Sequence, residues 1–238
     1  MPSGTVLSLN RWPVKSMAGE AVDALQLFEH GVEGDRRWAL SWRDGQRLTA
    51  RAAPRMLAWS AATKHGDTVV RDPDGRVWRW DEPGLADAIS RDLEKEVALV
   101  EDPTLMQDFP DSVLVTFQAT LAALSGELGH AIDLRRFRPN VHVALDADPF
   151  AEATWEGRRL VVGAAELELL HPCKRCAIVT RDPDTQEAWG GLLKHIHGRH
   201  GSAFGINARP VAPATVWVGD QVTLRSPDGA PDGDTPGP

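Results

Sequence analysis

Hydrophobic and polar residues alternate through much of the first third of the chain. The segment TVLSLNRWPV (5–14) alternates as a strand with one buried face does. Two longer segments, RRWALSWRDGQRLTA (36–50) and DTVVRDPDGRVWRW (67–80), each read as two strands joined by an Asp-Gly turn. The turns are Asp44–Gly45 and Asp74–Gly75. This part of the chain is predicted to form a β-meander.

A helical spacing first appears in GLADAISRDLEKEV (84–97), where hydrophobic residues recur every four positions. These residues are Leu85, Ile89 and Leu93. A second helix is predicted after the buried strand DSVLV (111–115), with Thr116 or Thr120 near its start. The inner face of this helix would hold Leu121, Leu124 and Leu128.

Strand patterns return in the second half of the chain, in RPNVHVAL (138–145), RLVVG (159–163) and AELELL (165–170). The segment ATVWVGDQVTLR (214–225) is predicted to be a hairpin around Gly219 and Asp220. AELELL leads directly into HPCKRC (171–176), so a loop leaving a strand is expected there. Residues 227–238 are mostly Pro, Gly and Asp with little to bury, which predicts a disordered tail.

Net charge and hydropathy exclude several classes of protein. The formal net charge of −8 argues against a general nucleic-acid binder, which would present a basic face. No segment approaches the ~18 consecutive apolar residues of a membrane-spanning helix, and the N-terminus lacks the apolar run of a secretory signal. We therefore expect a cytoplasmic protein that contacts neither membrane nor nucleic acid.

The two cysteines of the chain, Cys173 and Cys176, lie only three positions apart in HPCKRC. A reducing cytosol disfavours a structural disulfide, which leaves redox exchange, metal ligation or core packing. The β-branched run after Cys176 does not suit a thioredoxin-like helix start, and a zinc site with His195 and His200 would need unusually long spacing. Packing of both thiols ranks below ligation, because charged residues separate them. A single thiolate could also complete a metal held mainly by an organic cofactor.

Such a cofactor needs positive charge for its phosphate, and basic residues recur where predicted strands end. They occur in PVKS with Lys15 and Ser16, in GDRRW with Arg36, and in RRFRPN with Arg135, Arg136 and Arg138. Each group taken alone is typical of a solvated surface. Their order along the chain is the informative feature.

That order resembles the MOSC-domain proteins (molybdenum cofactor sulfurase C-terminal domain) that carry an N-terminal β-barrel domain. The N-terminal motifs are RWPVKSMAGE, HGVEGDRRWAL and RLTARAAPRM. The MOSC motifs are FRPNVHV, FAEATWEGRRLVVGAAELELLHPCKRCAIVTRDPDT and VWVGDQV. The chain is similar to the mitochondrial amidoxime-reducing component and to bacterial reductases of N-hydroxylated compounds. The resemblance implies a mainly β fold with a few short helices, in two associated barrel-like domains over residues 1–100 and 101–226.

The resemblance also implies the residues of a molybdenum-cofactor site. Cys176 would ligate molybdenum and serve the catalysis, and its cationic neighbours would favour the thiolate and attract the anionic cofactor. The cofactor-contacting positions implied are Lys15, Ser16, Arg36, Thr120, Arg138, Asn140, Lys174 and Arg175. Thr120 would supply a helix-start hydroxyl near the phosphate. Gln186 departs from relatives that have glycine after DPDT.

The activity implied is the reduction of small N-oxygenated substrates by a monomeric molybdenum enzyme. Electrons would come from a separate donor protein, because two cysteines cannot supply a plant-type iron–sulfur cluster. No haem, iron–sulfur or pyridoxal-phosphate site is expected in this chain. An alternative is a non-catalytic carrier of molybdenum cofactor or sulfur that uses Cys176 as a persulfide site. A structural or zinc-binding module is a third possibility.

Overall fold

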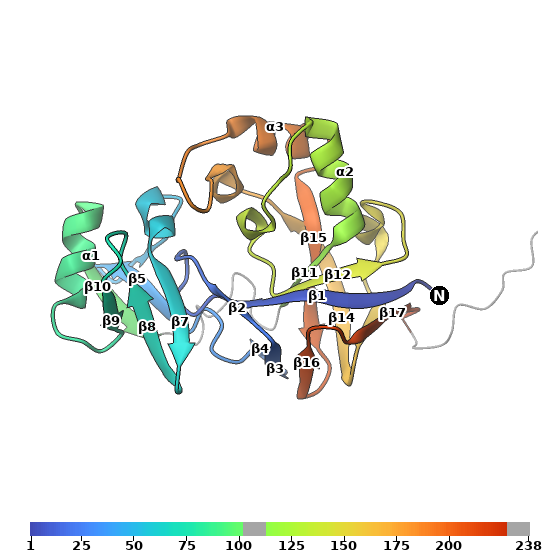
Figure 1. Ribbon diagram of the computed structural model, residues 1–238, viewed down its shortest axis with the longest axis horizontal. Helices are drawn as coiled ribbons and strands as arrows, with labels where there is room; N and C mark the ends of the chain where they lie inside the picture. Colours follow the sequence, from blue (N-terminus) through green and yellow to red (C-terminus); the bar gives the residue numbers. More distant parts are fainter. Residues whose placement is uncertain (102–112, 228–238) are drawn as a thin grey trace, which may run out of the picture.

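The strands form two assemblies that lie side by side (Figure 1). The computed structural model describes residues 1–101 and 113–227, and over these residues it consists mostly of strands with three α-helices. The mainly β fold with short helices predicted from the sequence is therefore confirmed. The predicted tail at 227–238 lies almost wholly outside the described residues, as does the start of the segment DSVLV.

Seven strands close into a barrel. Their order is β12, β11, β15, β14, β13, β17 and β1, and pairing of β1 with β12 closes the ring. The strands are β1 (Ser3–Arg11), β11 (Val113–Phe117), β12 (Val141–Leu145), β13 (Arg159–Val162), β14 (Ala165–Lys174), β15 (Ala203–Pro210) and β17 (Gln221–Arg225). Inward-facing aliphatic side chains such as Val6, Leu160 and Ile206 fill the interior. The first strand of the chain is thus part of a barrel built mainly from the second half, and a division into domains at residue 100 stays a prediction.

The other assembly, which we call the first assembly because its strands come early in the chain, contains two three-stranded sheets, ordered β10-β5-β6 and β7-β8-β9. Their strands are β5 (Trp38–Trp42), β6 (Arg47–Leu48), β7 (Ser60–Lys64), β8 (Asp67–Arg71), β9 (Val77–Arg79) and β10 (Val97–Glu101). Helix α1 (Leu85–Leu93) buries Leu85, Ile89 and Leu93 against them, as the four-residue spacing predicts. Gly45 and Gly75 have positive φ in the two predicted turns.

A further sheet, β16-β3-β4, corrects the prediction for the last segment. Its strands are β3 (Ala24–Phe28), β4 (Gly31–Val32) and β16 (Ala214–Trp217), and the short β2 (Glu20–Val22) pairs with β1. The segment 214–225 does contain two strands, but they do not pair with each other. β16 pairs with β3, whereas β17 pairs with β13 and β1 to complete the barrel.

Strand β14 runs further than the sequence predicted. The pairing of β14 with β15 shifts register on both sides of Pro172 and continues to Lys174. A bulge tolerates a proline that has no N–H to donate, so Pro172 does not end the strand. Cys173 therefore lies in β14, and only Cys176 lies beyond its end.

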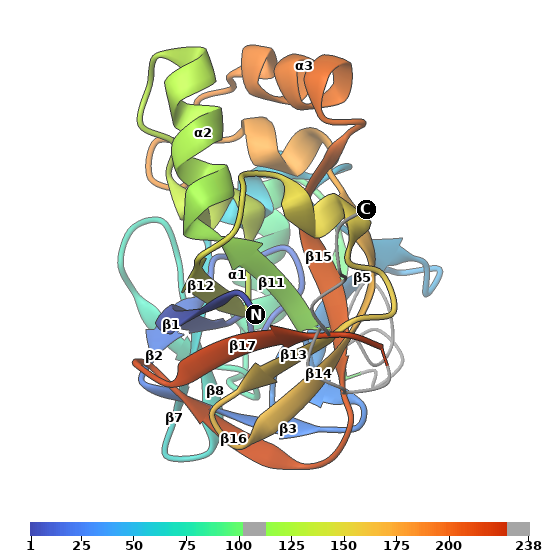
Figure 2. The same ribbon diagram turned by 90° about the vertical axis from the view of Figure 1, so that its right-hand side faces the viewer.

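Two helices cover one end of the barrel and form its helical cap (Figure 2). They are α2 (Gln118–Leu128) and α3 (Gly190–Arg199). A separate hydrophobic cluster beneath them includes Leu124, Ile196 and the stacked pair Phe137 and Phe204. Short 3-10 helices connect the elements: η1 (Pro54–Ala58), η3 (Leu134–Phe137), η4 (Ala151–Thr154) and η5 (Ala177–Thr180). None of the helices in residues 1–101 and 113–227 has the length and apolar composition that crossing a membrane requires.

Candidate functional site

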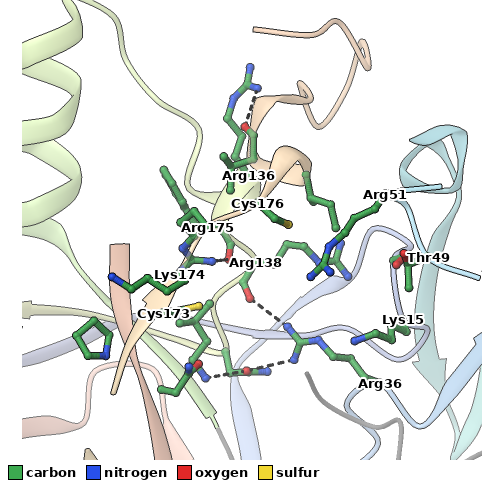
Figure 3. Close-up of a pocket in the computed structure, with 18 of the residues that line it drawn as sticks. Lys15, Arg36, Thr49, Arg51, Arg136, Arg138, Cys173, Lys174, Arg175 and Cys176 are labelled. Atoms are coloured by element: carbon green, nitrogen blue, oxygen red, sulfur yellow. Dashed lines mark hydrogen bonds between the residues drawn. The ribbon is translucent and has the colours of Figure 1, made fainter. Parts of the chain in front are cut away.

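A cavity of about 750 Å³ brings together side chains from both assemblies. Its size falls in the range of pockets for small molecules and cofactors. Figure 3 shows Lys15, Arg36, Thr49 and Arg51 facing Arg138 and the cysteines across it. The described lining residues are Lys15, Ser16, Arg36, Arg47, Thr49, Arg51, Leu114, Arg136, Phe137, Arg138, Asn140, His171, Pro172, Cys173, Lys174, Arg175, Cys176, Ile178, Val179 and Asn207.

Lys15 and Ser16 occupy the turn that follows β1. The backbone N–H of Lys15 donates to the carbonyl of Trp38 at 2.7 Å, which ties this turn to β5. Lys15 is only 6% exposed and Ser16 only 5%, although both line the cavity. A lysine so far from bulk water is unusual and favours an anionic neighbour.

Arg36 extends from the turn before β5 to the barrel side of the cavity. Its Nη1 is paired with the buried carboxylate of Asp35, and its Nη2 donates to the backbone carbonyl of Arg138 at 3.3 Å. Asp35 also accepts the backbone N–H of Trp12 at 2.7 Å. Burial raises the pKa of Asp35, and the Arg36 guanidinium opposes that shift.

Arg138 and Asn140 come from the segment between η3 and β12. The guanidinium carbon of Arg138 lies 4.3 Å from the ring centroid of Trp12, a cation–π contact that holds the side chain. The Asn140 amide accepts the backbone N–H of Leu114 at 3.2 Å and donates to the carbonyl of Asn10 at 3.3 Å. Asn140, which lines the cavity, therefore links its own segment to β11 and β1.

Three of the lining residues have left-handed backbone conformations. The φ angles are 70° for Ser16, 50° for Arg36 and 56° for Arg138. Each such conformation costs a non-glycine residue on the order of 1 kcal/mol, and such strain concentrates at functional sites. Their shared location at one cavity supports a binding role for this region.

Both cysteines line the cavity and are free thiols of intermediate exposure. Cys176 is the residue that precedes η5, and its carbonyl accepts the N–H of Val179 at 3.2 Å. The side chains of its two cationic neighbours donate to backbone carbonyls. Lys174 Nζ donates to the carbonyl of Gly201 at 2.6 Å, and Arg175 donates to the carbonyls of Phe204 and Phe137 at 2.5–2.9 Å.

Arg175 lines the cavity, as the resemblance implies for a cofactor contact. Its guanidinium also links the backbone carbonyls of Phe204 and Phe137. Its positive charge still acts on the cavity. That Lys174 and Arg175 favour both the Cys176 thiolate and an anionic cofactor stays a prediction.

The sequence prediction missed three lining residues in and after β6, two of which are basic. Arg47 lies in β6, Thr49 follows it, and Arg51 lies in the turn that comes next, so one short segment supplies all three. The available signal was the pair of arginines in RLTAR, which is part of a motif that carries the family resemblance. Arg136, one of the basic residues that the sequence singled out in RRFRPN, does line the cavity, and it donates to Asp182 at 2.7 Å.

Thr120 is not among the described lining residues of this cavity. It does lie in the first turn of α2, but its hydroxyl is fully buried and donates to Glu152 at 2.9 Å. The same oxygen accepts the backbone N–H of Phe150. Burial raises the pKa of Glu152, which favours a protonated or strongly hydrogen-bonded carboxyl there.

The zinc alternative with four Cys and His ligands is also not formed. His195 and His200 contact Glu127 on the helical cap, and in the described part of the chain neither cysteine joins a metal-ligating cluster. Cys173 and Cys176 line the cavity without them.

Gln186 has a φ of 63°, a backbone conformation that favours glycine. Its side-chain nitrogen donates to the carbonyl of Leu57 at 3.3 Å and to that of Pro183 at 3.1 Å. The glutamine thus has a strained backbone, and its side chain links the loop after η5 to the first assembly through Leu57.

The lining carries eight Lys and Arg side chains and, among the described residues, no Asp or Glu. The chain as a whole has a formal charge of −8, so this positive charge is local. The cavity is suited to a multiply charged anion that presents a soft metal or an electrophile to a thiol.

Family models match both parts of the chain. The model described as the MOSC N-terminal beta barrel domain matches residues 3–100, and the MOSC domain model matches residues 107–223. The chain belongs to the MOSC-domain proteins with an N-terminal β-barrel domain.

Relatives of this MOSC protein include the vertebrate mitochondrial amidoxime reducing components 1 and 2. The human mitochondrial amidoxime reducing component 2 is 29% identical, with 76% of this chain and 68% of that protein covered. The zebrafish (Danio rerio) mitochondrial amidoxime-reducing component 1 is 26% identical, with 76% and 70% covered.

One solved structure shares the fold along nearly the whole MOSC protein. The YuaD protein from Bacillus subtilis superposes with a TM-score of 0.50 at 13% identity, over 95% of this chain and 98% of that one. This likeness concerns the fold alone.

Proposed function

We propose that this MOSC protein is a molybdenum-cofactor-dependent oxidoreductase that reduces small N-oxygenated substrates with electrons from a separate redox protein. The observation that carries the proposal is the composition of the cavity. A soft thiol, Cys176, lies in a lining with eight basic side chains and no described acidic one. The names of the amidoxime-reducing relatives supply the substrate class.

The residues present fit such a cofactor. Thiolate sulfur suits a metal that is already bound by a dithiolene, and Arg and Lys bind phosphate through charge-assisted hydrogen bonds. The cavity volume of about 750 Å³ leaves space for a pterin and a small substrate. When bound, the cofactor supplies the two-electron chemistry that removes oxygen from an N–O group.

The side chains divide into three groups by what they do. Cys176 would ligate the metal. Lys15, Ser16, Arg36 and Arg138 would hold the phosphate region, with Arg51 adding charge from the side of β6. Asn140, Lys174 and Arg175 keep the wall in place through bonds to backbone carbonyls, and the two cations also attract the anion.

The direct test uses protein purified from a host that makes molybdenum cofactor. Chemically reduced holoprotein is expected to convert benzamidoxime to benzamidine, with the oxygen leaving as water. Protein from a host that lacks the cofactor should be inactive, and Cys176→Ala should lose the molybdenum-dependent turnover while Cys173→Ala retains most of it.

A carrier would give a different result. Full molybdenum and pterin occupancy, with no turnover of amidoxime under several electron donors, would favour the carrier alternative over the enzyme. Equal loss in the two cysteine variants would indicate that the thiols act as a pair.

A further inference from the structure

We propose that Glu127, His195 and His200 form a binding site for a divalent transition-metal ion, with Zn²⁺ as the probe. This site lies on the helical cap, and its argument is independent of the proposed function. The three side chains each offer one ligand atom, and those atoms lie within 4.8 Å of one another.

The two imidazoles converge on the same carboxylate oxygen. Nε2 of His195 lies 2.5 Å from Oε2 of Glu127, and Nε2 of His200 lies 2.8 Å from that oxygen. Ligand atoms around a tetrahedral zinc ion are about 3.3 Å apart, given metal–ligand distances of about 2.0 Å. A small opening of this cluster would therefore place an ion between the three atoms.

Separate elements bring the ligands together. Glu127 lies in the last turn of α2, His195 lies in the middle of α3, and His200 is the residue after α3. His200 leaves helical geometry, with φ −125° and ψ 28°. A residue five positions from His195 would face elsewhere on a continuous helix, so this departure permits both rings to reach Glu127.

Neighbouring residues also fix the orientation of one ligand. The His200 ring stacks on Phe150 with centroids 3.7 Å apart and an angle of 11° between the planes. The backbone N–H of Phe150 donates to the buried hydroxyl of Thr120, which anchors this support. Such surrounding contacts commonly orient histidine ligands and reduce the entropy lost on binding.

The site keeps an open side. The Glu127 side chain is 36% exposed, whereas those of His195 and His200 are 20% and 14% exposed. Two neutral imidazoles and one carboxylate are a donor set that zinc accepts, with water in the remaining position. Zinc binding would displace any proton on the two Nε2 atoms and would join α2 to α3 through the ion.

The same helix provides a matched control. His197 lies between the two ligands in sequence, but its Nδ1 contacts the Ser202 hydroxyl at 2.6 Å. It is not part of the cluster. Substitution of His197 removes an imidazole from α3 without removing a proposed ligand.

The test is equilibrium dialysis of the full chain against Zn²⁺ at pH 7.5, with metal counted by mass spectrometry. Wild type and His197→Ala should bind one more zinc ion per chain than His195→Ala, His200→Ala and Glu127→Gln. Zinc affinity at this site should fall at least about tenfold in the three ligand variants. Circular dichroism of each metal-free variant checks that it is folded.

X-ray absorption of zinc-loaded wild type keeps the proposal testable if a variant does not fold. Two imidazoles with otherwise oxygen neighbours are expected. Sulfur neighbours would place the zinc at Cys173 or Cys176 and overturn the proposal. Equal zinc binding by wild type and all three ligand variants would overturn it too, and Glu127 would then serve only as an ion-pair partner of the histidines.

Discussion

The guanidinium of Arg36 donates to the backbone carbonyl oxygen of Arg138 at 3.3 Å, although 102 residues separate them in the chain. Both residues have left-handed backbone conformations and both line the cavity. The contact joins the first assembly to the barrel at the place where we propose the cofactor phosphate binds. The two halves of the site are therefore coupled before any ligand enters.

Arg36→Gln is expected to lower both cofactor retention and stability. The substitution removes a proposed phosphate contact and also leaves the buried Asp35 carboxylate without its main partner. The loss in unfolding free energy should be about 3 kcal/mol. Arg91→Gln is the control, because Arg91 is exposed on α1 and its substitution should change stability by less than about 0.5 kcal/mol. Molybdenum per chain and the melting temperature of each variant measure the two effects, and equal molybdenum in both variants would count against the inter-assembly site.

Arg51→Gln should lower cofactor retention with less effect on folding than Arg36→Gln has. Arg51 is an exposed residue of the cavity lining, so its loss should leave the melting temperature nearly unchanged. If it contacts the cofactor phosphate, the lost charge-assisted bond is worth roughly 1.5–3 kcal/mol, or about tenfold or more in affinity. Pterin release after dilution measures this. Wild-type release kinetics in Arg51→Gln would remove Arg51 from the binding set.

Asp35 gives Arg36→Gln a distinctive pH dependence. Burial raises the pKa of Asp35 in the folded chain, so the folded state holds the proton more tightly than the unfolded state, and stability falls as pH rises through the folded pKa. Without Arg36 that pKa rises further. The stability difference from wild type should therefore grow as the pH rises above about 4, the ordinary pKa of an aspartate. Urea unfolding at several pH values measures how this stability difference depends on pH. The dependence should vanish in the double variant Asp35→Asn, Arg36→Gln. A pH-independent difference between Arg36→Gln and wild type would contradict the role of Asp35.

His142 predicts a loss of stability in acid. Burial lowers the pKa of this histidine to about 4, and its two ring nitrogens contact Thr116 and Gln118 at 2.9 and 3.0 Å. The unfolded state takes up a proton near pH 6.5, whereas the folded state resists protonation, so stability falls as pH drops from about 6.5 toward 4. The contribution should be about 2 kcal/mol between pH 7 and pH 5. His142→Gln should flatten this acid limb, and an unchanged limb in unfolding experiments would rule out His142 as its source.

Local sequence patterns predicted the elements well where burial has a simple period. The spacing of Leu85, Ile89 and Leu93 predicts α1, and alternation with Asp-Gly turns predicts the hairpins of the first assembly. Pairing between strands that lie far apart in the chain could not be predicted in this way. Nothing local in ATVWVGDQVTLR shows that β16 pairs with β3 while β17 closes the barrel, because that choice depends on which partner edge is free.

The candidate site shows the same limit. Lys15, Arg36 and Cys176 were predicted from motifs, and the fold brings them to one cavity, but motifs do not reveal where a side chain makes its bonds. Thr120 points into the barrel cap because buried Glu152 offers it a partner. Arg51 was missed because a basic residue in a turn resembles an ordinary solvated side chain until the opposite wall of the cavity is known.

The most direct test of the central claim is X-ray absorption at molybdenum, which counts the sulfur atoms around the metal. The account predicts that holoprotein carrying Cys176→Ser has one sulfur neighbour fewer than wild type, and that Cys173→Ser has the wild-type number. Both variants should be compared at matched pterin content, so that lost cofactor is not mistaken for a lost ligand. An unchanged sulfur count in Cys176→Ser would contradict the assignment of Cys176 as the metal ligand in this cavity.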